Sequence, residues 1–259
     1  MLCAVMVFWG TGPWPWPLGP GAGTVPAAAV LAQGQPVWVQ VDKLHRGRFQ
    51  PGNLDKSLHL LEKACKAEPG EYELLWRLAR AYYWQGSQAA SNQEKLAWFK
   101  KARDAAERAT QSNPNGVRGY YWLAVAIGKY GQTRGILQSL FMVKPMKEAL
   151  DKCLALDPKF APAHYVLEEL YRLVPGFPLS IGDKRRALEE ARLAVRYGPT
   201  STTHWLGLGE AAVANGDYAL ARESLKQCIA MPVDPEDDVA DPAADKKYAA
   251  ELLNQIRGK

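Results

Sequence analysis

The sequence predicts an all-α protein, a right-handed α-solenoid built from helical hairpins. Two observations predict this fold class. A small residue recurs five or so positions before a proline, at the end of a segment whose apolar residues have helical spacing. A second segment with helical spacing follows each proline. Stacked hairpins of this kind bury a continuous core between neighbours, so the pattern favours one extended array of repeats.

The helix before each proline is defined by its apolar stripe. Leu54, Leu58 and Leu61 show the i, i+3, i+4 spacing of an amphipathic helix. Proline cannot continue a helix interior, so each of these helices is expected to stop there. The element occurs four times with a looser fifth copy: Ala64 with Pro69, Ala109 with Pro114, Cys153 with Pro158, Ala194 with Pro199, and Cys228 with Pro232.

The helix after each proline carries a large residue, a leucine three positions later and then a small residue, except in the third copy, where Glu168 takes the small position. The segments are 75–83, 121–126, 164–171 and 205–210. Glycine favours helix C-termini. Gly86, Gly131 and Gly216 are therefore expected to end the first helix of their hairpins.

These residues resemble the tetratricopeptide repeat over residues 54–232. The last copy keeps the standard spacing with Trp205, Leu208, Gly209, Gly216, Ala221 and Leu225. Earlier prolines lie 45, 44 and 41 residues apart, longer than a standard repeat of about 34 residues. The extra residues are expected in loops within the hairpins, at 87–94, 132–143 and 174–182. We therefore divide the chain into residues 1–40 and a repeat domain at 41–259, with about four and a half repeats and a C-terminal capping helix.

Further motifs resemble one group of these repeat proteins. The motifs are Gly119-Tyr120-Tyr121-Trp122, Gly135-Ile136-Leu137, Leu156-Asp157-Pro158 and Val174-Pro175-Gly176-Phe177-Pro178. The group includes the T component of TRAP-type transporters, and the regulator of microtubule dynamics family is a eukaryotic relative. The resemblance implies a non-catalytic solenoid and, for the transporter component, a periplasmic lipoprotein that associates with a solute-binding protein. The sequence as written lacks the lipobox cysteine of that component.

The N-terminal residues favour export. Met1–Trp9 are apolar, a Pro/Gly/Trp-rich stretch follows, and a second apolar run ends at Val30-Leu31-Ala32 in the manner of a cleavage site. We expect mature protein in the periplasm or cell envelope, beginning near Gln33. The alternative is a cytoplasmic protein with an N-terminal arm. No run of about 20 apolar residues is present, so no conventional transmembrane span is expected.

Composition excludes several function classes. The net charge is only +5 and basic residues form no cluster, which argues against nucleic-acid binding. The four cysteines form no CxxC pair, so no zinc site is expected, and Cys65, Cys153 and Cys228 are predicted to be buried helix residues. No P-loop, GxSxG, HExxH or dinucleotide fingerprint occurs. We expect no enzyme activity and no cofactor; a hydrolase would need an acid/base pair that the sequence does not display.

The candidate site is the concave face, which the helices after the prolines are expected to line. Aromatic and arginine residues predominate there, as they do in binding hot spots. Paired hydrogen bonds from the arginines suit a carboxylate. The alternative is that the aromatic side chains pack between helices and the arginines lie on solvated faces. The candidate residues are Trp76, Arg80, Tyr83, Trp84, Arg118, Tyr121, Lys129, Tyr165 and Arg172.

The expected function is a binding or scaffolding module of the cell envelope, with a transporter accessory as the alternative. The partner would be a protein, such as a solute-binding protein, or a small anionic ligand; homo-oligomerisation stays open.

Three local features have two interpretations each. Residues 132–143 form either a short helix over the groove or a segment packed on its own hairpin. His164 is interpreted as a core residue rather than a catalytic one, and Ser180–Asp183 as a helix N-cap rather than a phosphate site.

Overall fold

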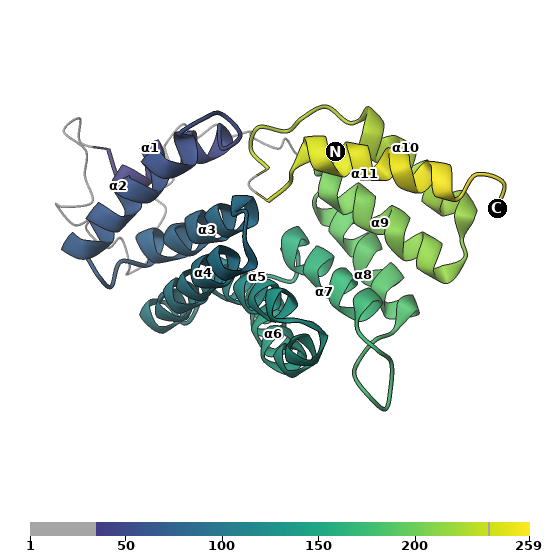
Figure 1. Ribbon diagram of the computed structural model, residues 1–259, viewed down its shortest axis with the longest axis horizontal. Coiled ribbons are helices and arrows are strands. Elements are labelled where there is room, and N and C mark those ends of the chain that lie inside the picture. Colours follow the sequence, from purple (N-terminus) through teal and green to yellow (C-terminus); the bar gives the residue numbers. More distant parts are fainter. Residues whose placement is uncertain (1–34, 238) are drawn as a thin grey trace, which may run out of the picture.

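The computed structural model describes residues 35–237 and 239–259, and eleven α-helices make up this part of the protein (Figure 1). No strand occurs among these residues, although Gly176 and Gly182 form an isolated β-bridge. The predicted all-α solenoid is confirmed. The helices are α1 (Val37–Arg46), α2 (Asn53–Ala67), α3 (Tyr72–Gln88), α4 (Asn92–Ser112), α5 (Val117–Arg134), α6 (Ile136–Leu156), α7 (Ala161–Leu173), α8 (Lys184–Tyr197), α9 (Thr202–Asn215), α10 (Tyr218–Ala230) and α11 (Pro242–Gln255).

Consecutive helices pair as antiparallel hairpins, from α1 with α2 to α9 with α10, and α11 packs on the last pair. Helices α3, α5, α7 and α9 form an inner row in which neighbours contact one another. The outer helices are held by alanine stripes that permit close approach. In α8, for example, Ala187, Ala191 and Ala194 are all buried. The sequence pattern of small residues before each proline therefore positions the outer helices against the inner row.

The core is continuous from α1 to α8 and continues as smaller clusters around α9–α11. Its largest fully buried side chain is Trp122 of α5. Cys65, Cys153 and Cys228 are buried free thiols, as the sequence predicts. Burial raises the pKa of Cys65 to about 11, so this thiol stays protonated at neutral pH.

Several helix ends follow the predicted chemistry. Asp183 caps α8 by accepting hydrogen bonds from the backbone N–H groups of Arg185 and Arg186, which confirms the predicted N-cap. Gly216 ends α9 with a φ of 77°, a left-handed conformation that glycine adopts without strain. Ser91 and Glu94 form a reciprocal capping box at the start of α4.

Two predicted helix ends are wrong. Gly86 and Gly131 lie inside α3 and α5 rather than at their C-termini. A β-carbon on Gly86 would lie 2.7 Å from the Phe99 ring, and one on Gly131 would lie 2.8 Å from Met142. These glycines let the two helices of a hairpin approach each other where a large side chain faces them.

The extra residues of the long repeats mainly lengthen helices instead of forming loops. Residues 87–94 and 132–143 extend α3, α4, α5 and α6, and each pair is joined by only a few residues. Residues 136–143 begin α6, which packs along α5, so the interpretation as packing on its own hairpin is confirmed and the separate helix over the groove is wrong. Only the third insertion, at 174–182, lies between helices, in the connection from α7 to α8.

The connection between α10 and α11 crosses the molecule from the C-terminal hairpin to the turn after α1 (Figure 1). We call residues 232–237 and 239–241 the strap. Arg46 contacts Glu236, and Arg48 donates hydrogen bonds to the backbone of Asp237 and Ala240. The strap therefore joins two ends of the solenoid that are far apart in sequence, since Arg46 and Glu236 are separated by 190 positions.

The predicted export segment and its cleavage site near Gln33 lie outside the described residues. Helix α1 begins at Val37 and crosses the predicted boundary between residues 40 and 41. Within the described ranges no helix has both the length and the apolar character needed to cross a membrane.

Candidate functional site

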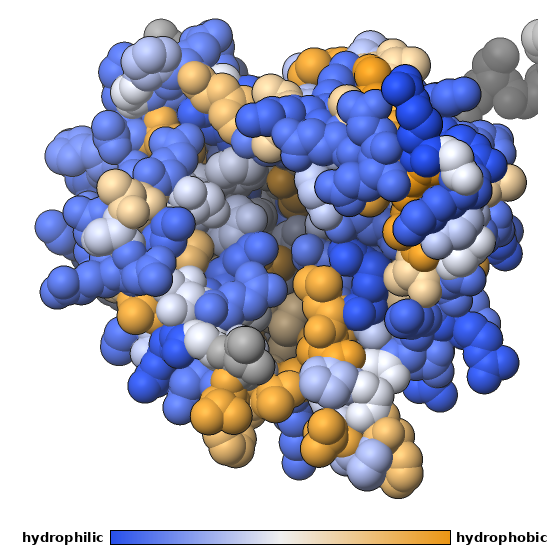
Figure 2. Space-filling view, turned by 45° about the vertical axis from the view of Figure 1, so that its right-hand side comes forward, coloured by the Kyte–Doolittle hydropathy of each residue, from blue (hydrophilic) through white to orange (hydrophobic). Residues whose placement is uncertain are grey.

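A cavity of about 250 Å³ opens on the concave side of the inner helix row. Figure 2 shows this face hollowed near its middle, with hydrophilic surface around the hollow and apolar surface below it. Helices α3, α5 and α7 form its main walls, and Met146 of α6, the starts of α9 and α11 and the end of the strap complete them. The lining residues are Tyr83, Trp84, Ser87, Tyr121, Val125, Gly128, Lys129, Gln132, Met146, Tyr165, Val166, Glu169, Thr203, Val239, Asp241 and Asp245. We call this the aromatic cavity.

The aromatic walls are fixed by packing. The Tyr83 ring lies 5.5 Å from Trp84 and 5.4 Å from the buried Trp122. Tyr121 also contacts Trp122, at 5.0 Å between ring centroids. Trp84 and Tyr121 are almost fully buried, whereas Tyr83 and Tyr165 stay partly exposed. The cavity is therefore preformed, and its two partly exposed tyrosines offer flat surfaces with little rotamer entropy to lose.

Charged groups also line the aromatic cavity. Burial disfavours the charge on Lys129, but the interactions with Tyr83 and Glu169 outweigh it and raise the pKa of Lys129. Across the cavity, Asp245 accepts hydrogen bonds of 2.7 Å from the hydroxyl groups of Thr202 and Thr203. Burial nevertheless raises the pKa of Asp245 to about 6. The cavity thus combines aromatic walls and one cation with several carboxyl groups, whereas the sequence predicted aromatic surface combined with positive charge.

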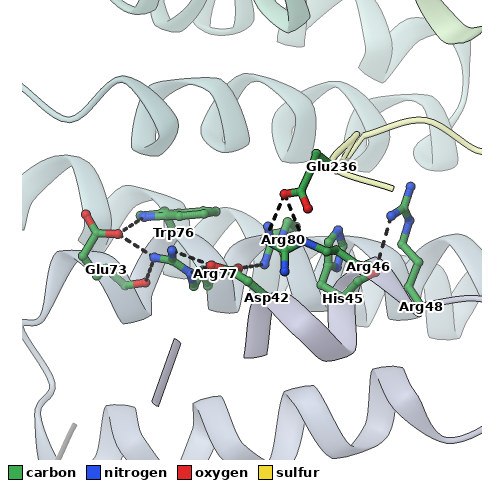
Figure 3. Close-up of polar contacts among 9 residues, drawn as sticks. All are labelled: Asp42, His45, Arg46, Arg48, Glu73, Trp76, Arg77, Arg80 and Glu236. Carbon is green, nitrogen blue, oxygen red and sulfur yellow. Dashed lines mark hydrogen bonds and ion pairs between the residues drawn. The ribbon is translucent and has the colours of Figure 1, made fainter. Parts of the chain in front are cut away.

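A second, polar cavity of about 160 Å³ lies beside α1 and α3. Its lining residues are Asp42, His45, Arg46, Trp76, Arg77, Arg80, Arg118 and Glu236. We call this the arginine cavity. Figure 3 shows Asp42, Arg77 and Arg80 side by side along the Trp76 ring, with Glu236 reaching in from the strap.

The guanidinium groups of the arginine cavity surround Trp76. The Cζ atoms of Arg77, Arg118 and Arg80 lie 4.0, 4.8 and 5.0 Å from the Trp76 ring, within cation–π range. The Trp76 Nε1–H donates to Glu73 at 3.0 Å. The ring is therefore a buried platform that carries several cations on its surface.

Asp42 neutralises part of this charge. It accepts hydrogen bonds from Arg77 at 2.7 Å and from Arg80 at 2.6 Å. Burial alone would raise the pKa of Asp42, but the two arginines lower it below its ordinary value. Glu236 pairs with Arg46 at 2.9 Å, and both side chains are substantially exposed. The strap thus supplies a carboxylate that the solvent can reach, whereas Asp42 is built into the fold.

The predicted site residues divide between the two cavities. Tyr83, Trp84, Tyr121, Lys129 and Tyr165 line the aromatic cavity, and Trp76, Arg80 and Arg118 line the arginine cavity. The prediction placed aromatic and cationic groups in one groove, and the structure places them in two adjoining cavities. Their role in binding stays a prediction.

Arg172 is the candidate residue that belongs to neither lining. It donates to the fully buried Glu168 and, at 3.1 Å, to Glu210. Burial raises the pKa of Glu168 to about 8, and Arg172 opposes that shift. Arg172 was expected to bind the carboxylate of a ligand. Its carboxylate partners instead come from the protein itself: Glu168 on the same helix, α7, and Glu210 on α9.

The histidine that the sequence singled out is a structural residue. His164 is buried, with Nδ1 2.6 Å from a Glu190 oxygen and Nε2 3.0 Å from the Pro158 carbonyl oxygen. Trp205 occupies the equivalent position in the next repeat and donates to the Pro199 carbonyl oxygen at 2.9 Å. The core interpretation of His164 is confirmed, because this position fixes the turn before the inner helix.

Sequence reasoning did not identify the lining residues that come from α1, the strap and α11. Asp42, Arg46, Glu236, Val239 and Asp245 all line one of the two cavities. Opposite charge is the signal that could have paired Glu236 with Arg46, because the acidic run at 234–241 has no basic residue and Lys43, Arg46 and Arg48 are close in sequence. No such signal marks Val239. Among the described residues no group of three or more histidine, cysteine, aspartate or glutamate side chains is arranged to hold a metal ion.

Comparison with solved structures supports the fold. The chain is similar to a thermophilic TPR protein from Thermus thermophilus, with a TM-score of 0.62, 18% sequence identity, and coverage of 83% of this chain and 97% of that one. A tetratricopeptide repeat profile also matches residues 179–232. The protein is thus a tetratricopeptide-type helical scaffold, a fold that typically binds protein partners and is typically non-enzymatic.

Comparison with curated sequences points to one family. Regulator of microtubule dynamics protein 1 of Bos taurus is 31% identical over 144 residues, which cover 55% of this chain and 44% of that protein. Regulator of microtubule dynamics protein 3 of Rattus norvegicus is 29% identical over 128 residues, 49% of this chain and 27% of that protein. The chain therefore spans less than half the length of these relatives. The resemblance to the transporter T component stays a prediction.

The family profile of regulator of microtubule dynamics protein 1-3 matches residues 37–170, more than half of the chain. The match begins at the first residue of α1 and ends in α7, so it contains most of the lining residues of both cavities but not Glu236 of the strap. The chain belongs to the regulator of microtubule dynamics protein 1-3 family.

Proposed function

We propose that this protein is a non-enzymatic scaffold that binds a segment of a partner protein in the aromatic cavity. The observation that carries the proposal is the preformed wall of Tyr83, Tyr121 and Tyr165 beside Lys129 on the inner helix row. Tyrosines held by packing provide contact area at low entropic cost, and a nearby cation orients a polar group of the partner.

The size of the cavity favours a peptide over a free small molecule. Sites for drug-sized ligands usually measure roughly 300–1,000 Å³ and enclose most of the ligand. The aromatic cavity measures about 250 Å³ and is open along the groove. One or two side chains of an extended peptide would fill it while the peptide backbone runs along the inner helices.

The relatives' names connect the family with microtubule dynamics. We propose that this chain, too, binds a protein partner, and that it does so through the two cavities, most of whose lining residues lie within the family match. The second candidate is a ligand-binding accessory of a TRAP-type transporter in the cell envelope. The cations of Arg46, Arg80 and Arg118 around Trp76 favour this candidate, since they suit a small carboxylate.

The test compares groove and outer-surface variants in affinity capture from the native cell. Tyr165→Ala and Lys129→Met remove the partly exposed ring and the cation of the aromatic cavity. The captured partner should be depleted at least tenfold, because truncation of an anchor residue commonly costs about 2 kcal/mol or more of binding free energy. The matched controls are Tyr218→Ala and Lys226→Met on the outer helix α10.

Thermal unfolding of all four variants must accompany the capture experiment. Equal capture by native protein and by both groove variants would contradict the proposal. Capture of a solute-binding protein, with loss on Arg118→Ala but not on Tyr165→Ala, would favour the transporter accessory instead.

A further inference from the structure

We propose that the strap is an internal competitor for the binding face, and that the partner presents an acidic segment with a turn like that of the strap and an aliphatic residue three positions after a glutamate. The inference deepens the proposed function and rests on it. It follows from where the strap places Glu236 and Val239, because these two residues enter the two cavities in the way a bound peptide would.

The first contact is the charge pair in the arginine cavity. Glu236 accepts from Arg46 Nε at 3.0 Å and lies 2.9 Å from Arg46 Nη2, so one carboxylate oxygen meets the fork of the guanidinium group. Figure 3 shows Glu236 entering from above, on the opposite side from the Asp42 contacts. The side chains of Arg46 and Glu236 are 45% and 68% exposed, so solvent and competing anions reach this pair.

The second contact is between Arg48 and the backbone of the strap. Arg48 donates to the carbonyl oxygen of Asp237 at 3.1 Å and also to that of Ala240. Its guanidinium group lies 4.7 Å from the Trp84 ring centroid, beside the aromatic cavity. Bonds to main-chain carbonyl groups do not depend on side-chain identity, so Arg48 would hold any segment whose backbone followed the same path.

The third contact is apolar. Val239 stands three residues after Glu236, packs against the main core and lines the aromatic cavity. The strap therefore places a carboxylate in one cavity and an aliphatic side chain in the other, with its backbone held between them. These are the three elements of peptide recognition: a charge, a backbone clamp and an apolar anchor.

The chemistry of the partner follows from this template. The strap carries Asp234, Glu236, Asp237 and Asp241, and the face beneath it carries Arg46, Arg48, Arg80 and Arg118. A partner that replaced the strap would meet the same cations, so an acidic segment fits and a basic one is repelled. Glutamate followed at the third position by an aliphatic residue reproduces the spacing of Glu236 and Val239.

Displacement of the strap is thermodynamically feasible. The strap is a connection without regular helix or strand, and its charge pair is exposed. The exposed ion pair contributes little, so lifting the strap costs chiefly the hydrogen bonds from Arg48 to Asp237 and Ala240 and the packing of Val239. Such a local opening needs less free energy than global unfolding. Because the strap is tethered at both ends, its effective concentration is high, and a peptide added in solution binds only to the fraction of molecules in which the strap has lifted.

The experiment measures binding of a fluorescent peptide with the sequence of residues 232–241, PVDPEDDVAD, by fluorescence anisotropy. The protein is the full chain in three forms: native, a released variant (Glu236→Lys with Val239→Asp) and a control variant outside the strap (Glu223→Lys with Leu137→Asp). The control has the same charge change at exposed positions. The released variant should bind the peptide at least tenfold more tightly than the native and control proteins, because its own strap no longer competes.

A second peptide, with Glu236→Gln and Val239→Ser, should bind the released variant at least tenfold more weakly than the first. Adding Arg46→Ala to the released variant should weaken the first peptide and leave the second unchanged. Circular dichroism and thermal unfolding establish that each variant is folded. Equal affinity of native and folded released protein, or no binding to the released protein, would overturn the proposal. Neither result would affect the capture test of the aromatic cavity, so the two proposals can fail separately.

Discussion

Buried carboxyl groups give single residues of this protein a measurable effect on its stability. Glu168 and Asp245 both have pKa values raised by burial, to about 8 and about 6. Asp42 shows the opposite shift, because Arg77 and Arg80 outweigh the effect of its burial. The two directions have opposite consequences for stability as the pH changes.

The first prediction concerns Asp245. Its folded-state pKa of about 6 lies above the ordinary value of 3.8, so the folded protein binds the proton more tightly than the unfolded chain. The stability contributed by protonated Asp245 is therefore present below about pH 4 and is lost as the pH rises to about 6. Relative to Asp245→Asn, the native protein should lose about 2 kcal/mol of unfolding free energy between pH 4 and pH 7. Urea denaturation of both proteins across that range measures the difference, and a difference that did not change with pH would contradict the assignment.

The candidate site shows what the sequence could and could not predict at the residue scale. The aromatic residues were found because their phase in the repeat places them on the inner helices. The pairing of the arginines was not predicted. Arg80 pairs with Asp42 of α1 at 2.6 Å and Arg172 pairs with Glu210 of α9, so both depend on carboxylates from other helices that no local spacing encodes. Glu168 is different, because it lies four residues before Arg172 on the same helix, a spacing at which ion pairs form.

At the scale of the helix, the close approach of neighbouring helices, rather than helix propensity, determines where small residues occur. Ala109 of α4 and Ala194 of α8 have no exposed surface. Both occupy the position before a proline at which the outer helix meets its neighbours. The repeat phase predicted this burial correctly, because small residues recur wherever two helices approach closely.

The second prediction is that Ala109→Phe and Ala194→Phe each lower the free energy of unfolding by about 1–3 kcal/mol, because the added ring overpacks a filled contact. Ala230→Phe is the matched control, since Ala230 is exposed at the end of α10. Denaturant midpoints measure all three. Unchanged midpoints for both buried variants would contradict the prediction, because they would mean that the helices can accommodate a phenylalanine at these positions.

Glycines and insertions mark the limit of pattern-based prediction for elements. A glycine near the end of an apolar stripe either ends the helix, as Gly216 does, or accommodates a bulky neighbour, as Gly86 does with Phe99. The choice depends on a residue of the opposing helix. For the same reason the extra residues of the long repeats were expected in loops, although helix pairs lengthen together when each covers the other's apolar face.

At the scale of the whole molecule, the solenoid is closed across its concave side by the strap. Repeat proteins usually rely on contacts between neighbouring repeats, and stability then follows from local terms. Here α1 and the connection to α11 meet although they are far apart in sequence. Hydrophobic periodicity predicts the hairpins but not this closure, because the contacts are hydrogen bonds to backbone atoms of an irregular segment.

The last prediction tests the energetic weight of this closure. Arg48 is 4% exposed and donates to the carbonyl oxygens of His45, Asp237 and Ala240. Arg48→Met keeps much of the packing but removes these charge-assisted hydrogen bonds, so the unfolding free energy should fall by about 2–4 kcal/mol. The matched control is Arg46→Met, whose exposed ion pair should contribute no more than about 1 kcal/mol.

Hydrogen exchange distinguishes a local effect of Arg48→Met from loss of the closure. If Arg48 joins the two ends of the solenoid, amide exchange in α1 and α11 should become faster together, while α4 and α5 in the middle of the array keep their protection. Faster exchange in α1 alone would mean that Arg48 stabilises only the turn after that helix. Joint deprotection is expected because the strap transmits the lost contacts directly to the N-terminus of α11, where Asp241 caps the helix by accepting from the Ala244 N–H.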